Sequence, residues 1–180
     1  MSVVLVVDDD VQIARALRIN LTARGYHVVT ASDGAGALRA ASDAKPDVIV
    51  LDLGLPDMDG TEVITTIRGW SVTPVIVLSA RTDSSAKIRA LDAGADDYVT
   101  KPFGMDELMA RVDVIKRERV RVRDELLAMG YDVPETQANF VWLPLGDRTA
   151  AFNEHCLSHK VIVRAFAGDG ARVMAGTSVS

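Results

Sequence analysis

Short apolar runs alternate with stretches of helical apolar spacing through the first hundred residues of the chain. Runs rich in valine and isoleucine predict strands, and apolar residues that recur every three or four positions between them predict helices. Glycines and a proline close the helical stretches, at Gly25, Pro46, Gly69 and Gly94. The predicted strands cover residues 3–7, 26–30, 48–51, 75–78 and 97–100.

Five strand-then-helix units in this order predict an α/β protein. Right-handed crossovers place helices on both faces of a parallel sheet, because the crossovers change sides around a switch point. We therefore expect a flavodoxin-like, doubly wound sheet of five parallel strands.

Polar residues follow four of the predicted strands directly. Asp8 and Asp9 follow the first strand, Asp52 the third, Ser79 the fourth and Lys101 the last. Open α/β folds keep their chemistry at the carboxyl edge of the sheet, so these side chains are expected to converge there. Neighbouring carboxylates repel one another, which raises their pKa values and favours a hard divalent cation. Magnesium fits best, since it keeps several waters and bridges carboxylates to phosphate oxygens.

Residues 1–111 resemble the receiver domain of two-component response regulators. The resemblance rests on the acidic pair at 8–9, on Asp52 with the LGLPDMDG segment after it, on Ser79-Ala80, and on AGADDY at 93–98 leading into Lys101-Pro102-Phe103. The 93–98 stretch resembles the subfamily with winged-helix outputs, and the whole region most resembles the regulators of potassium-transport genes.

This resemblance implies a chemistry for the acidic residues. Asp52 is implied to be the phosphoacceptor, which takes a phosphoryl group from a phosphohistidine of a sensor histidine kinase or from a small phosphodonor. Asp9 and Asp52 are implied to bind Mg²⁺ directly and Asp8 through water. The backbone carbonyl of Gly54 is implied to supply a further ligand.

The resemblance also assigns roles to three residues near the phosphoryl group. Lys101 is implied to offset its charge and Ser79 to donate a hydrogen bond to it. Tyr98 is implied to turn inward as Ser79 moves, so the two form a switch, although plain core packing is the alternative for Tyr98.

Other acidic residues have ordinary structural explanations. Asp10 and Asp33 are favoured as helix caps, and Asp57 and Asp59 are turn formers beside a proline and a glycine.

Five charged residues match a dimer face of the winged-helix subfamily. The resemblance implies that they pair across a symmetric homodimer, whereas simple exposed charge is the alternative. They are Lys87, Asp96, Asp97, Glu107 and Arg111.

The second half of the chain departs from this pattern. Residues 105–129 lack glycine and proline and predict one helix of about 37 Å, longer than the last helix of a receiver. We expect a receiver domain over 1–111 and a small α+β unit over 112–180 that share this helix. The unit's predicted elements are a strand at 138–143, a helix at 149–158, and strands at 161–166 and 171–175.

Residues 112–177 resemble the C-terminal part of histidinol-phosphate and aromatic aminotransferases. The carriers are ELLAMGY at 125–131, QANFVWLP at 137–144, VRAFAG at 163–168 and ARVMAGT at 171–177. Arg172 matches an arginine that grips the substrate carboxylate in that family. The large domain with the Schiff-base lysine has no counterpart here, so neither pyridoxal phosphate nor transamination is expected and Arg172 is expected to be idle.

Two functions from different classes follow. The first is a phosphorylatable signalling receiver, not an enzyme in the usual sense, without a DNA-binding output domain. The second is a natural or engineered chimera, a scaffold whose acidic pocket signals to nothing.

Composition narrows the partners. The net charge of −5 disfavours general attraction to nucleic acid or membranes, and we expect no direct nucleic-acid binding even though residues 116–123 are basic. A single cysteine and the lack of any long apolar segment indicate a soluble, cytoplasmic protein. His155, Cys156 and His159 have zinc-ligand spacing, but no fourth ligand is evident, and a surface helix is the favoured interpretation.

Overall fold

The computed structural model describes the chain except for residues 1, 81–82, 134–139, 159–163, 167–169 and 175–180. The chain divides into two compact units, an N-terminal unit over Met1–Asp113 and a C-terminal unit over Val114–Ser180. No helix among the described residues is both long and apolar enough to cross a membrane.

Five strands and five helices build the N-terminal unit, and the last helix continues beyond it. They are β1 (Val3–Val7), α1 (Val11–Ala23), β2 (His27–Ala31), α2 (Gly34–Ala44), β3 (Val48–Asp52), α3 (Gly60–Arg68), β4 (Val75–Ser79), α4 (Ser84–Asp92), β5 (Asp97–Thr100) and α5 (Met105–Ala128).

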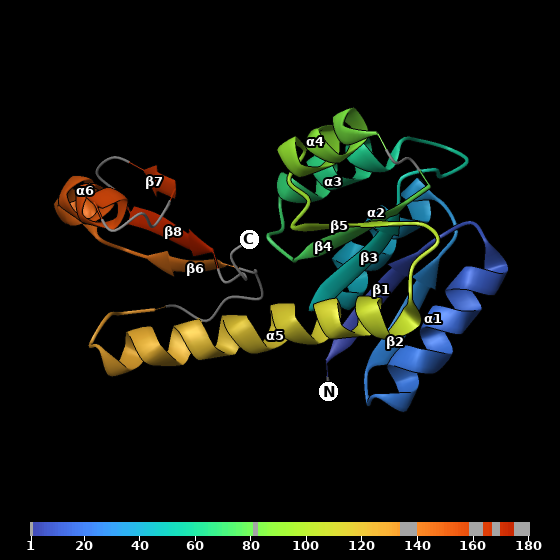
Figure 1. Cartoon of the computed structure of the whole chain (residues 1–180), viewed down its shortest axis with the longest axis horizontal. Coiled ribbons are helices and arrows are strands. Elements are labelled where there is room, and N and C mark those ends of the chain that lie inside the picture. The colour runs from blue at the N-terminus through green and yellow to red at the C-terminus, as the bar shows by residue number, and fades with distance from the viewer. Residues whose placement is uncertain (1, 81–82, 134–139, 159–163, 167–169, 175–180) are drawn as a thin grey trace. The chain divides into compact units, whose positions relative to one another are not determined.

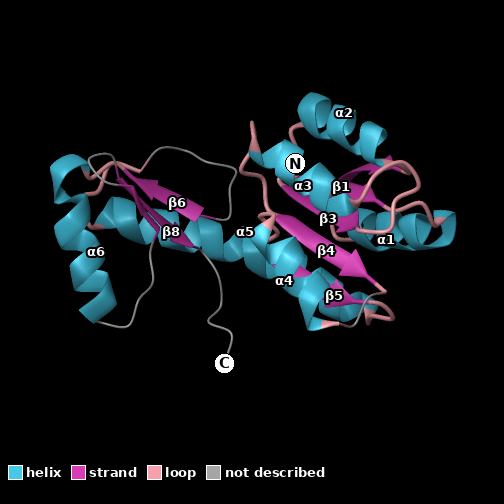
Figure 2. Ribbon diagram, turned by 90° about the horizontal axis from the view of Figure 1, so that it is seen from above, coloured by secondary structure: helices cyan, strands magenta, loops and turns pink. Residues whose placement is uncertain are grey.

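The five strands form one parallel sheet in the order β2-β1-β3-β4-β5. Helices α2, α3 and α4 cover one face, while α1 and the start of α5 cover the other (Figures 1 and 2). This arrangement confirms the predicted flavodoxin-like fold. It also places the carboxyl ends of β1 and β3 side by side, with β4 next to β3.

The central strands are buried because helices cover both of their faces. Every residue of β3 and β4 is buried, as are four of the five residues of β1. Continuous apolar runs are typical of such doubly covered parallel strands. The edge strand β2 begins at His27, one residue later than predicted, because the Tyr26 amide still donates to the Leu21 carbonyl at the end of α1.

The C-terminal unit contains a small antiparallel sheet and one further α-helix. Its elements are β6 (Phe140–Leu143), η1 (Gly146–Arg148), α6 (Thr149–Ser158), β7 (Arg164–Phe166) and β8 (Gly170–Met174). The strand order is β6-β8-β7. The helix has the predicted bounds, whereas parts of the three predicted strands lie outside the described residues.

A compact apolar cluster holds the C-terminal unit together. Its buried members are Val133, Leu143, Leu145, Cys156 and Ala171, and side chains of α5 pack against them. The helix predicted over 105–129 is observed as α5, which ends one residue earlier, at Ala128, and side chains of its last turns contribute to this second core.

Candidate functional site

Three carboxylates converge at the carboxyl edge of the sheet, as the order of the strands predicted. Val7 of β1 pairs with Leu51 of β3, so Asp8 follows β1 at the level where Asp52 ends β3. Oxygen atoms of Asp8, Asp9 and Asp52 lie within 4.8 Å of one another. Asp8 and Asp52 are only 2% and 8% exposed, whereas Asp9 is exposed.

Lys101 joins this cluster from the end of β5. Its Nζ lies 2.9 Å from Oδ2 of Asp8 and 3.1 Å from Oδ2 of Asp52. Its backbone amide donates to the Ser79 carbonyl at 2.7 Å, which holds the start of the following loop against β4. Burial acts to lower the pKa of Lys101, but its hydrogen bonds to Asp8 and Asp52 and the negative charges of these two carboxylates together outweigh burial, so the pKa is raised. The ammonium group therefore stays charged between two carboxylates.

The buried position of Asp8 makes its negative charge costly. Burial raises the pKa of Asp8 above its ordinary value, although Lys101 and the Asp10 amide, which donates to Oδ1 at 2.9 Å, both oppose the rise. Lys101 is thus the shared ion-pair partner of two buried carboxylates, and the exposed carboxylate of Asp9 lies beside them. A hard divalent cation with oxygen ligands suits this donor set, because it adds the positive charge that the cluster lacks.

Ser79 and Tyr98 occupy neighbouring strands near the same edge. Ser79 ends β4, pairs with Thr100 of β5 and is 2% exposed. Tyr98 is 8% exposed and belongs to the apolar cluster between the sheet and helices α2 to α4. The structure therefore places Tyr98 inward, a position that fits both core packing and the predicted switch.

The loop after Asp52 is tied down by a residue whose role the sequence did not reveal. Oδ1 of Asp57 accepts from the Gly34 amide at 2.7 Å, and Oδ2 accepts from the Ala35 amide at 2.9 Å. These amides belong to the first turn of α2, so Asp57 is more than a turn former. No local signal predicts the contact, because the partners are more than twenty residues away in sequence.

Three further aspartates that the sequence singled out also cap helices. Asp10 accepts from the amides of the first turn of α1, and Asp33 accepts from the Gly36 amide at 2.6 Å in α2. Both caps confirm the prediction. Asp59, expected to form a turn, also caps α3 by accepting from the Thr61 amide.

Most residues of the predicted dimer face pair within the chain. Arg111 bridges Asp97 at 2.7 Å and Glu107 at 2.8 Å. Asp96 pairs with Arg68 at 2.9 Å, a partner that the sequence did not suggest. Lys87 is exposed on α4.

Arg68 organises the region around Asp96. Its guanidinium group also donates to the carbonyl oxygens of Gly94 at 2.9 Å and Thr73 at 2.7 Å. The same Asp96 carboxylate accepts from the Val75 amide. Asp96 thus links α3, β4 and β5 inside one molecule.

A groove of about 340 Å³ opens beside the acidic cluster. Asp8 lines it together with residues of α1, of the end of β2 and of the turn after β2: Val11, Ala14, Arg15, Arg18, Thr30, Ala31 and Ser32. The groove gives solvent access to the region next to Asp8 and carries two arginines.

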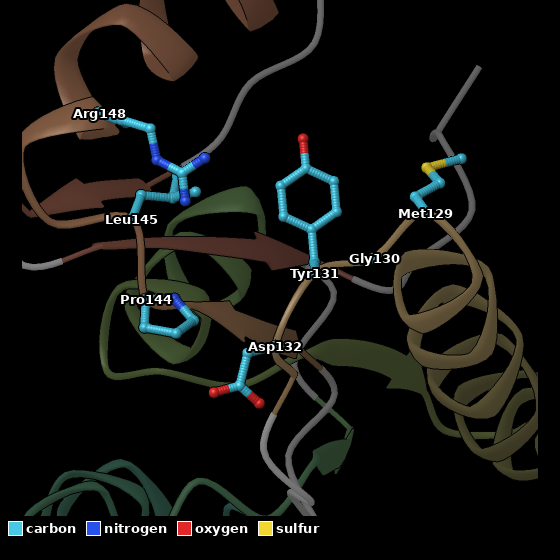
Figure 3. Close-up of a pocket in the computed structure, with 7 residues that line it drawn as sticks. All are labelled: Met129, Gly130, Tyr131, Asp132, Pro144, Leu145 and Arg148. Atoms are coloured by element: carbon cyan, nitrogen blue, oxygen red, sulfur yellow. The ribbon is translucent and has the colours of Figure 1, made fainter.

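The C-terminal unit has an open hollow of about 560 Å³. Figure 3 shows that the Tyr131 ring and the Asp132 carboxylate at this hollow point in opposite directions. Met129 at its rim is 70% exposed. The hollow contains none of the residues predicted to carry chemistry.

Two features of the C-terminal unit were singled out in the sequence: Arg172 and the group of His155, Cys156 and His159. Arg172 pairs with Trp142 and Arg164 in the strand register. His159 lies outside the described residues, and Cys156 is buried. Among the described residues, only Asp8, Asp9 and Asp52 form a group of potential metal ligands.

The geometry agrees with comparisons to known proteins. Residues 4–113 match the family model of the response regulator receiver domain. The chain therefore belongs to the response regulator receiver family. Receiver domains bind Mg²⁺ at an acidic pocket and are phosphorylated by sensor histidine kinases.

Among its relatives are KdpE-type regulators. The chain is 71% identical over 112 residues to the transcriptional regulatory protein KdpE of Mycobacterium tuberculosis (strain ATCC 25618 / H37Rv), a match that covers 62% of this chain and 50% of KdpE. It is 54% identical over 117 residues to the KDP operon transcriptional regulatory protein KdpE of Escherichia coli (strain K12), covering 65% of this chain and 52% of that protein. The chain thus spans about half the length of these relatives.

Solved receiver structures share the fold. The Francisella response regulator 1452 receiver domain superimposes with a TM-score of 0.61 at 40% identity, covering 63% of this chain and 95% of that one. The chemotaxis response regulator CheY4 of Vibrio cholerae gives a TM-score of 0.60 at 34% identity, covering 63% and 97%.

The names of the relatives bear on two expectations from the sequence. They describe transcriptional regulators, which does not fit the expectation that this protein avoids nucleic acid. Since the chain spans only half of them, the expected lack of a DNA-binding output domain is not retained either.

Proposed function

We propose that the protein accepts a phosphoryl group on Asp52 from a sensor histidine kinase or a small phosphodonor, with Mg²⁺ bound beside it. The observation that carries the proposal is the cluster of Asp8, Asp9, Asp52 and Lys101 at one edge of the sheet. Asp52 is the nucleophile because it ends the central strand and its Oδ2 faces a lysine that tolerates further negative charge.

The transfer is an in-line displacement at phosphorus. A carboxylate oxygen of Asp52 forms the new bond, and the bond from phosphorus to the imidazole nitrogen of a phosphohistidine, or to the acyl oxygen of a small donor, breaks. The leaving group keeps the electron pair and takes up a proton from solvent where its basicity requires one. The side chains supply position and charge: Lys101 lies within 3.1 Å of the reacting carboxylate, and buried Ser79 ends the neighbouring strand.

In this proposal Asp9 and Asp52 would hold Mg²⁺ directly and Asp8 would hold it through water, while the backbone carbonyl of Gly54 would supply a further ligand. A β-carbon built on Gly54 lies 3.7 Å from Oδ2 of Asp52, so this backbone runs close to the phosphoacceptor. When bound, Mg²⁺ would supply positive charge beside the carboxylates and the incoming phosphoryl group. The groove beside Asp8 offers room for the body of the phosphodonor.

Two finer roles belong to this proposal. Ser79 and Tyr98 act as the switch pair, in which the inward position of Tyr98 accompanies the movement of Ser79 toward the phosphoryl group. Lys87, Asp96, Asp97, Glu107 and Arg111 contribute to a homodimer face, where the ion pairs now closed within one chain exchange for pairs between chains.

Intact-mass analysis with acetyl phosphate tests the phosphoryl acceptance. The expected result is one phosphoryl adduct that requires Mg²⁺, disappears with a chelator and is absent from an Asp52→Asn variant. A folded wild-type protein without an adduct would contradict the proposal.

The second candidate concerns the C-terminal unit. Its antiparallel sheet with α6 is compatible with the small α+β fragment of an aminotransferase joined to the receiver through α5, as in a recombined chimera without biological output. We expect no pyridoxal phosphate binding and no transamination. An absorbance titration with pyridoxal phosphate tests this expectation, since binding through a lysine would produce a new visible band.

A further inference from the structure

We infer that Asp57 is a positioning residue for the metal site, because it fastens the loop after Asp52 to the first turn of α2. The inference rests on the proposed function, since the loop carries the Gly54 carbonyl that is proposed to ligate Mg²⁺. Asp57 itself lies three residues beyond Gly54 and acts through the backbone between them.

Both carboxylate oxygens of Asp57 take part in the contact, and they accept from backbone amides that have no partner within α2. The first amides of any helix lack partners within the helix. In α2, Asp33 satisfies the Gly36 amide, whereas both oxygens of Asp57 satisfy the amides of Gly34 and Ala35. These two amides lower the pKa of Asp57, Gly34 contributing most. Asp57 therefore remains a carboxylate near neutral pH and holds α2 by two hydrogen bonds.

Close packing also holds the loop after Asp52 against the start of α2. A β-carbon built on Gly34 would lie 2.3 Å from Cγ of Met58 and 2.6 Å from its Sδ, so the loop lies directly against the start of α2. Only a glycine at position 34 permits this approach without a shift of Met58.

The base of the loop is fixed as well. The Gly60 amide donates to the Leu53 carbonyl at 3.0 Å, and a β-carbon on Gly60 would lie 2.7 Å from the Asp52 carbonyl oxygen. The loop is therefore closed at its base by Gly60 and held near its tip by Asp57. Gly54 lies between these two points, which is why the contact at Asp57 limits where its carbonyl can lie.

The test compares two aspartates that cap the same helix. Asp57→Ala removes the tie between loop and helix, while Asp33→Ala removes a cap of α2 without touching the loop. Asp57→Asn retains one acceptor oxygen and should fall between Asp57→Ala and the wild type. Mg²⁺ affinity is measured by calorimetry, and amide resonances of Gly34 and Ala35 report whether the contact is lost.

We expect Asp57→Ala to weaken Mg²⁺ binding about tenfold, the usual size of an effect from a residue that orients a metal ligand. Asp33→Ala should bind Mg²⁺ as the wild type does. With acetyl phosphate, Asp57→Ala should need more Mg²⁺ for half-maximal phosphorylation yet approach the wild-type rate at saturating Mg²⁺.

Two outcomes would overturn the inference: unchanged Mg²⁺ affinity in Asp57→Ala, or equal losses in Asp57→Ala and Asp33→Ala, which would trace the effect to α2 alone. Calorimetry does not depend on phosphorylation. A wild-type protein that binds Mg²⁺ but takes up no phosphoryl group would therefore defeat the proposed function and leave the role of Asp57 to be decided by the titration.

Discussion

The two units of the chain place their charged residues differently. In the N-terminal unit, Lys101 joins two buried carboxylates, and Asp96 accepts from Arg68 with its side chain only 9% exposed. In the C-terminal unit, the ion pair of Arg121 with Glu125 lies on side chains that are more than half exposed. Exposed pairs contribute little free energy, whereas buried charges need partners and have shifted pKa values.

The difference in the burial of charged groups indicates which unit carries the functional site. Perturbed, buried ionisable groups mark functional sites more often than exposed ones do. The N-terminal unit has such groups at the carboxyl edge of its sheet, clustered with a lysine. In the described core of the C-terminal unit, the ionisable group with a shifted pKa is the Cys156 thiol, and burial among apolar side chains is what raises that pKa. We therefore place the proposed phosphoryl transfer in the N-terminal unit.

The largest effect is expected from the phosphoacceptor. Asp52→Asn should abolish phosphoryl uptake from acetyl phosphate, because the amide is not a competent nucleophile. Asp132→Asn, which changes a carboxylate at the hollow of the C-terminal unit, should leave uptake unchanged. Intact-mass time courses of both variants measure this contrast. Equal losses of phosphoryl uptake in the two variants would contradict the assignment of the phosphoacceptor to the N-terminal unit.

Lys101→Met should slow phosphoryl uptake about a hundredfold or more, because a charge aimed at the reacting oxygens is lost. The same change leaves two buried carboxylates without their cation and should lower the free energy of unfolding by about 3 kcal/mol. Urea unfolding with and without Mg²⁺ tests this, and Mg²⁺ should recover part of the loss. Stability that is equal to wild type in both conditions would show that the pair with Lys101 contributes nothing.

Arg68→Ala should lower the free energy of unfolding by about 2 to 3 kcal/mol, because it strands the largely buried Asp96 carboxylate and two carbonyl groups. The matched change in the C-terminal unit, Arg121→Ala, should cost about 0.5 kcal/mol or less. Chemical denaturation of the two variants gives the values. A larger effect for Arg121 would reverse the contrast between buried and exposed pairs.

The smallest effect is expected from the pH dependence of Asp57. Its hydrogen bonds with Gly34 and Ala35 lower the pKa in the folded state below the ordinary 3.8. The contribution of Asp57 to stability is therefore present above the unfolded pKa and is lost as the pH falls through the folded pKa. Asp57→Asn should flatten this acid-dependent part of the stability curve, measured by urea unfolding between about pH 6 and pH 3. An unchanged slope would show that the lowered pKa does not affect folding.

The sequence predicted the fold of the N-terminal unit and the converging acidic residues because both depend on local order along the chain. Strand ends are visible as apolar runs that stop at Asp8, Asp52 or Ser79, and a parallel sheet brings such ends together. Helix caps such as Asp10 were predicted for the same reason, since their partners lie within three residues.

Contacts between distant segments were not predicted. Asp57 reaches α2, and Arg68 reaches Asp96 across more than twenty residues, so no periodicity or spacing indicates either partner. Tyr26 likewise donates to Asp113 on α5. These side chains connect elements that are distant in the sequence and become neighbours only in the folded structure.

The most direct test of the account is to locate the phosphoryl group on the chain. Wild-type protein is treated with acetyl phosphate and Mg²⁺, reduced with borohydride to trap the acyl phosphate, digested and mapped by mass spectrometry. We predict a trapped residue at Asp52 and none in peptides of Val114–Ser180. Labelling at any other carboxylate, or no labelling of a folded protein that binds Mg²⁺, would contradict it.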